Sequence, residues 1–131
     1  LLPPFTNLGK LGFNFGLQGV QFTAVSTTAE NQTLSNSMYV HSIPNNNDNQ
    51  DIVSMGTNAA VLTSKVIENT FEVLAIEAMA IVQAIDAIEC KNEVSSGTRK
   101  IYDDIRAILP VFTEDKVMYP YVQAIKDYLM K

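Results

Sequence analysis

A run of side-chain amides, Asn45-Asn46-Asn47-Asp48-Asn49-Gln50-Asp51, leads directly into the longest apolar stretch of the chain. Carboxamides donate and accept hydrogen bonds without titrating, so their chemistry is to bind and orient polar or anionic groups. Asp51 can cap a helix, because its carboxylate accepts from the free N–H groups of a first turn. The run therefore predicts amides at the positive end of a long helix, where a polar or anionic ligand can be held. A low-complexity loop without a ligand is the alternative interpretation.

The other residues that could carry chemistry are few. The chain has one histidine, His41, and one cysteine, Cys90, so neither a metal cluster nor an intrachain disulfide is expected. No glycine-rich phosphate loop is present. We interpret His41 as a loop imidazole, because no serine or cysteine stands at a recognisable spacing from it, and Cys90 as a small residue near a helix end. A lone thiol and no signal peptide predict a cytoplasmic protein.

The elements that would position the amides are predicted to be helical. Apolar residues recur at helical spacing over residues 51–88, and from Phe71 onward they cover most sides of the helix. Such a helix is expected to be surrounded by other helices. Residues 1–13 read as a loop, residues 14–36 as a helix despite a strand-like content of threonine, and residues 37–50 as the site loop.

Two shorter helices are predicted after the long one. Ser96 or Thr98 can cap a helix over residues 98–109, which Pro110 ends. Acidic residues open a last helix over residues 114–130, and Pro120 falls close to its first turn, where a helix tolerates proline. The expected fold class is all-α, a bundle organised around the long core helix.

Composition narrows the class of protein. The 131 residues are 47% hydrophobic and 18% charged with a net charge of −5, which indicates one folded domain without a nucleic-acid surface. Glu77 and Gln83 interrupt the longest apolar run, so no membrane span is expected. Before Asp48 the formal charges are Lys10 and Glu30 alone. The first third is therefore expected to be covered by partner subunits or by a missing part of the same polypeptide.

Several motifs in order resemble the histidine and aromatic amino acid ammonia-lyase family. The matching pieces are Leu2-Pro3-Pro4-Phe5, Leu17-Gln18-Gly19-Val20-Gln21-Phe22-Thr23-Ala24, Glu30-Asn31-Gln32-Thr33-Leu34, Val40-His41-Ser42-Ile43-Pro44, Asn49-Gln50-Asp51-Ile52-Val53-Ser54-Met55-Gly56-Thr57, Leu74-Ala75-Ile76-Glu77 and Gln83-Ala84-Ile85-Asp86. His41 departs from the aspartate that the family carries at that place. The resemblance covers about two-thirds of the chain closely.

The resemblance implies a helical enzyme of the aspartase-like fold that forms a homotetramer with active sites shared among subunits. It also implies elimination of ammonia from an L-amino acid by a protein-derived methylidene-imidazolone, which forms from an internal Ala-Ser-Gly and needs no metal. That triplet is absent here, and Ser95-Ser96-Gly97 reads as a helix-entry turn. The chain is therefore interpreted as a C-terminal fragment of a longer enzyme, inactive alone and not a stable monomer.

One position bears on the substrate. By the resemblance, typical histidine ammonia-lyases carry Gln-Glu-Asp at the place of Asn49-Gln50-Asp51, and their glutamate lies close to the substrate. The residue at that glutamate position here is Gln50. A carboxamide cannot pair as an anion with an imidazole, so Gln50 favours tyrosine or phenylalanine over histidine. The resemblance places Asn49 and Gln50 in the wall of the site and its hydrogen-bond network, with Asp51 as the helix cap.

Two alternatives stay open. An aminomutase of the same family, which returns the amine to the β-carbon, fits the same motifs. A non-catalytic helical interaction protein, binding a partner through the charge-poor first third, fits the composition. An upstream Ala-Ser-Gly in the same reading frame would exclude the second alternative, and a start codon just before Leu1 would favour it.

Overall fold

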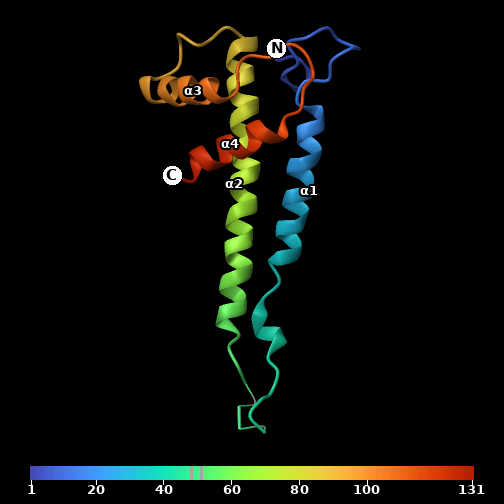
Figure 1. Cartoon of the computed structure of the whole chain (residues 1–131), viewed down its shortest axis with the longest axis vertical. Helices are drawn as coiled ribbons and strands as arrows, with labels where there is room; N and C mark the ends of the chain where they lie inside the picture. Colours follow the sequence, from blue (N-terminus) through green and yellow to red (C-terminus); the bar gives the residue numbers. More distant parts are fainter. Residues whose placement is uncertain (48, 51) are drawn as a thin grey trace.

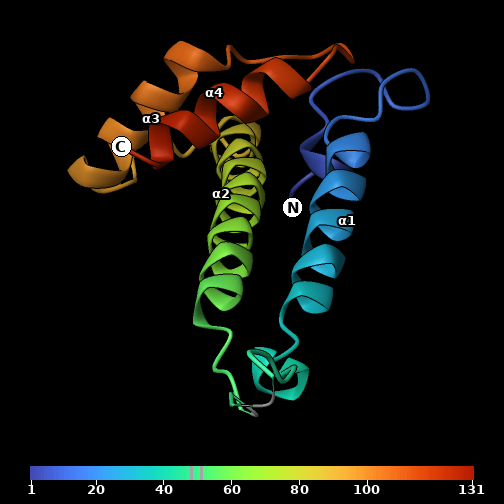
Figure 2. The same ribbon diagram turned by 60° about the horizontal axis from the view of Figure 1, so that its bottom comes forward.

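The computed structural model describes residues 1–47, 49–50 and 52–131, and these contain four α-helices. Helix α1 spans Gln18–Leu34, α2 spans Gly56–Ala87, α3 spans Ser96–Ile108 and α4 spans Tyr119–Leu129, with short 3-10 turns at Pro4–Thr6 and Met38–His41. Helices α1 and α2 run antiparallel side by side, and the connection between them lies at one end of the pair (Figure 1). Helices α3 and α4 lie at the opposite end (Figure 2). The expected all-α fold is confirmed.

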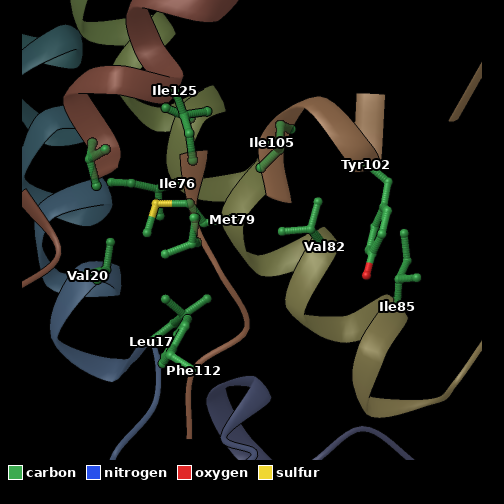
Figure 3. Packing of buried hydrophobic residues seen from close by; sticks show 13 residues of the cluster. Leu17, Val20, Ile76, Met79, Val82, Ile85, Tyr102, Ile105, Phe112 and Ile125 are labelled. Carbon is green, nitrogen blue, oxygen red and sulfur yellow. The ribbon is translucent and has the colours of Figure 1, made fainter. Parts of the chain in front are cut away.

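The hydrophobic core lies at the end of α2 that meets α3 and α4. The second half of α2 contributes Ile76, Met79 and Val82 at helical spacing, and these side chains are buried. They pack against α1, α3, α4 and the segment between α3 and α4 (Figure 3). The other buried hydrophobic residues of this core are Leu17, Val20, Ala75, Ile85, Tyr102, Ile105, Leu109, Phe112, Val122 and Ile125.

A polar network inside this end ties α3 to α2. The Gln83 side chain is fully buried, donates to the Phe112 carbonyl at 2.8 Å and accepts from the Arg106 guanidinium at 2.9 Å. Arg106 also forms a salt bridge with Asp86, whose other oxygen accepts from the Tyr102 hydroxyl at 2.5 Å. Burial, followed by the hydrogen bond to Asp86, raises the pKa of Tyr102. These contacts satisfy a buried amide that would otherwise destabilise the core.

The first and last helices are shorter than expected because Asp115 is used in a tertiary contact. Its carboxylate accepts from the backbone N–H groups of Phe15 at 3.0 Å and Gly16 at 3.1 Å. Its own N–H donates to the Asn14 side chain at 3.0 Å. The chain therefore turns at Gly16, with φ of 62°, and α1 begins at Gln18 rather than at residue 14. Residues 114–118 are likewise non-helical, and α4 begins at Tyr119.

Helix α3 begins at a serine N-cap, and helix α4 begins with a proline in its first turn. Ser95, rather than Ser96 or Thr98, is the N-cap of α3, and its hydroxyl accepts from the Thr98 N–H at 3.2 Å. Helix α3 ends at Ile108, just before Pro110. Pro120 lies in the first turn of α4, as predicted, where its missing N–H leaves no intrahelical bond unmade.

Away from this core, many large apolar side chains face solvent. Examples are Phe22 of α1, which is 69% exposed, Val61 of α2, which is 64% exposed, and Ile52 before α2, which is 83% exposed. No helix in the described part of the chain is both long enough and apolar enough to cross a membrane.

Candidate functional site

Residues 45–47, 49 and 50 of the amide run form the tip of a hairpin at the end of the molecule remote from the core (Figure 1). Asn45 and Gln50 form an antiparallel bridge, with N–H to carbonyl distances of 3.0 Å and 3.3 Å in the two directions. Between them, Asn46 and Asn47 have left-handed backbones, with φ of 52° and 58°. Asparagine tolerates this conformation better than most residues. Asn46 and Asn47 thus belong to a turn with a defined backbone.

A side-chain contact fastens the two limbs below this tip. The Ser42 hydroxyl accepts a hydrogen bond from the backbone N–H of Val53 at 2.8 Å. Together with the Asn45–Gln50 bridge, it holds the limb that carries Gln50 against the limb that leaves the Met38–His41 turn. Sequence reasoning used Ser42 only as part of a motif, because nothing in a single sequence shows which backbone group a serine will meet.

The amides do not stand at the start of the long helix, contrary to expectation. Helix α2 begins at Gly56, and the preceding residue Met55 has a left-handed backbone with φ of 51°. Residues 52–55 are non-helical and separate Gln50 from the first turn of α2. Asp51, expected to cap the helix, lies outside the described residues. Asn49 and Gln50 therefore do not join the N–H groups of the first turn of α2 in one anion-binding site, as the sequence had predicted.

The hairpin tip is exposed in this chain. Asn49 and Gln50 are both exposed, and their backbones pair with described residues, Asn49 with Asn46 at 3.2 Å and Gln50 with Asn45. A cavity of about 410 Å³ lies nearest along the chain, but Met38 and residues of α2 between 57 and 62 line it. The described residues therefore supply one wall of a site at most. The two carboxamides can orient a polar group, and they cannot act as an acid or a base.

The remaining candidates add little chemistry. His41 ends the Met38–His41 turn and is exposed, and Cys90 is half-buried beyond α2. Within residues 1–47, 49–50 and 52–131, no three histidine, cysteine or acidic side chains gather as a metal site would require. The described part of the chain therefore offers the hairpin amides as its site candidates.

Comparison with known proteins gives this hairpin a context. The family model described as "Aromatic amino acid lyase" matches residues 1–107. The chain is 37% identical to histidine ammonia-lyase 1 of Fusobacterium nucleatum, covering 98% of this chain and 25% of that protein. It is 32% identical to the MIO-dependent tyrosine 2,3-aminomutase of Streptomyces globisporus, covering 99% of this chain and 24% of that protein.

Comparison of the fold with solved structures points to the same group of enzymes. The structure superposes on the phenylalanine aminomutase of Pantoea agglomerans with a TM-score of 0.94 and 34% identity, covering 99% of this chain and 25% of that one. The chain thus spans about a quarter of the length of the relatives that it matches.

Proposed function

Because the chain belongs to the aromatic amino acid lyase family, we propose that it is the C-terminal part of a longer enzyme that eliminates ammonia from an L-amino acid. The observation that carries this proposal is the family match over residues 1–107, which includes the hairpin. The exposed tip agrees with it, since a single wall of a site needs further segments to enclose a substrate. Those segments would come from the rest of the polypeptide and from sister subunits of a homotetramer.

Gln50 supports an aromatic, non-histidine substrate. The relatives do not decide between substrates, because histidine ammonia-lyases and aminomutases of tyrosine and phenylalanine both match over nearly the whole chain. A carboxamide at the hairpin tip can donate to a substrate carboxylate or to a neighbouring side chain, and it presents no charge to an imidazole. We therefore assign Gln50 to substrate orientation and Asn49 to the network that holds the tip.

An aminomutase is the second candidate. It is favoured by the similarity to the tyrosine 2,3-aminomutase of Streptomyces globisporus and to the phenylalanine aminomutase of Pantoea agglomerans. The first of these is named as MIO-dependent. The 131 residues contain no Ala-Ser-Gly from which such a group could form, so the residues of this chain do not supply it. In the proposed enzyme the group would form in the remainder of the polypeptide, and the hairpin would only border it.

The proposal is tested by Gln50→Glu in the full-length enzyme. A carboxylate beside a phenyl or phenol ring is costly to desolvate, whereas an imidazole can offset part of that cost by donating to it. The change of one hydrogen-bonded group is worth on the order of 1–3 kcal/mol, so kcat/KM for histidine relative to phenylalanine or tyrosine should rise roughly tenfold or more.

Steady-state kinetics with histidine, phenylalanine and tyrosine give the ratio for both enzymes. Gln32→Glu is the matched control, because it adds the same charge on an exposed face of α1 away from the hairpin. An unchanged ratio in the Gln50 variant would remove Gln50 from the site. The absence of ammonia release and of β-amino acid formation with all three substrates would refute the proposed function itself.

A further inference from the structure

An apolar groove of about 560 Å³ lies between α1 and the start of α4, at the opposite end of the molecule from the hairpin. Aromatic side chains form its rim: Phe15 is 56% exposed, Phe22 69% and Tyr119 74%. Large aromatic side chains are enriched where proteins bury surface against a partner, because each contributes a large apolar area. Gly19 also lines the groove, and no atom of another element lies within 4 Å of the place where its Cβ would stand. The wall at Gly19 is therefore open backbone that another element can approach closely.

The groove contains a half-buried carboxylate without a cationic partner among the described residues. Glu72 of α2 lines the groove, and its carboxylate accepts a long hydrogen bond of 3.5 Å from the Thr27 hydroxyl. The salt bridges of the described residues, Lys91–Asp103 and Arg106–Asp86, do not include it. A carboxylate that becomes further desolvated needs a cation or strong hydrogen-bond donors.

The lysine that lines the groove is engaged elsewhere. The Lys116 ammonium lies 4.4 Å from the centroid of the Tyr121 ring and 5.4 Å from that of Phe112, and it donates to the Tyr121 hydroxyl at 3.4 Å. The groove therefore combines apolar walls with two carboxylates. The Asp115 carboxylate accepts from the N–H groups of Phe15 and Gly16, whereas no salt bridge among the described residues includes Glu72. A complementary surface would be apolar with a single basic group.

We propose that this groove seats a helix from the remainder of the longer polypeptide, and that a lysine or arginine on this helix pairs with Glu72. The proposal rests on the proposed function, from which the longer polypeptide follows. The relatives are about four times the length of this chain, so most of the fold that could cover the groove lies outside these residues. A second copy placed groove to groove would oppose two Glu72 carboxylates, and like charges in one interface are repulsive.

Photo-crosslinking in the full-length enzyme identifies the occupant. p-Benzoylphenylalanine replaces Phe22, and in a control it replaces Val25, which is exposed on α1 outside the groove. After irradiation, peptide mapping of the Phe22 variant should show a crosslink within one polypeptide, to a helical segment outside these 131 residues with a lysine or arginine one or two turns away. The Val25 variant should not give that peptide. A crosslink only between copies of this 131-residue region, or no crosslink, overturns the proposal.

Charge removal tests the pairing separately. Glu72→Gln should lower the thermal midpoint of the full-length enzyme by several degrees more than Glu77→Gln, an exposed control on the same helix. High salt should leave most of the difference, because a buried pair is screened little. A neutral or stabilising Glu72→Gln refutes a cationic occupant. An active enzyme that fails both tests removes the groove proposal alone, whereas an enzyme that passes both without lyase or mutase activity removes the proposed function alone.

Discussion

Replacing Arg106 by methionine tests how much the buried polar network between α3 and α2 contributes to the free energy of unfolding. The guanidinium donates to the Leu109 carbonyl at 3.1 Å and to the Gln83 side chain at 2.9 Å, and it pairs with Asp86. The side chains of Arg106 and Asp86 are 10% and 20% exposed. Arg106→Met leaves the fully buried Gln83 oxygen without a donor, at a cost of about 1–3 kcal/mol.

The Asp86 carboxylate adds to that loss. Breaking a buried pair by removing one partner costs about 3–5 kcal/mol, and Asp86 falls at the low end because it keeps the Tyr102 hydroxyl and some contact with water. The two costs overlap, since both come from the same missing guanidinium. We therefore expect the free energy of unfolding to fall by about 3–4 kcal/mol. With a urea m-value of about 1–3 kcal/mol/M, the midpoint should fall by about 1–4 M.

Lys91→Met is the matched control, because it removes an exposed salt bridge between α3 and the turn that follows α2. Lys91 and Asp103 lie 3.0 Å apart with side chains 45% and 55% exposed, and the Lys91 ammonium also lies 4.7 Å from the centroid of the Tyr102 ring. Its removal should cost about 1 kcal/mol or less. Urea unfolding followed by circular dichroism at one fixed protein concentration compares the two, because association makes apparent stability concentration-dependent. Equal midpoint shifts would refute the assignment of Arg106 to a desolvated network.

Three further outcomes are expected. Burial raises the pKa of Tyr102 above its ordinary value of about 10, so the folded state holds the phenolic proton more tightly. This stabilisation is complete below pH 10 and is lost as pH rises through the folded pKa. Tyr102→Phe should therefore show a shallower loss of urea midpoint between pH 9 and 11, and an unchanged slope would contradict it. In the full-length enzyme, Ser42→Ala should lower kcat/KM by up to roughly tenfold, because one hydrogen bond that orients the hairpin is lost, while Ser37→Ala should not. Finally, the 131-residue chain alone should elute as oligomers and release no cinnamate or urocanate above a buffer blank, and a monomer that melts cooperatively or turns over would sink this expectation.

Much of the helical architecture could be predicted from the spacing of apolar residues. The second half of α2 carries apolar residues on most sides, and the structure buries Ile76, Met79 and Val82 between α1, α3 and α4. Prolines also indicated boundaries correctly, because Pro110 follows α3 and Pro120 lies in the first turn of α4. These signals are local, so a single sequence shows them directly.

The predicted helix boundaries are wrong where a residue that favours a helix start makes a contact with a distant part of the chain instead. Asp115 is a plausible residue for a helix start, yet the fold uses its carboxylate to hold the N–H groups of Phe15 and Gly16, about a hundred positions earlier. The left-handed backbone of Met55 likewise has no sequence signal, so α2 was expected to begin at residue 51 rather than at Gly56. In the proposed enzyme, the surroundings of Gln50 would depend on segments outside this chain. No pattern within 131 residues could predict them.

The length of α2 places the hairpin far from the buried core. Its 32 residues span about 48 Å at 1.5 Å per residue, with the buried core near its last turns and the hairpin beyond its first. A substitution at Asn49 or Gln50 therefore touches no residue on which the folding of α3 and α4 onto α2 depends. Under the proposed function, substitutions in the hairpin would change recognition at little cost to folding, because the hairpin and the buried core stand at opposite ends of one helix.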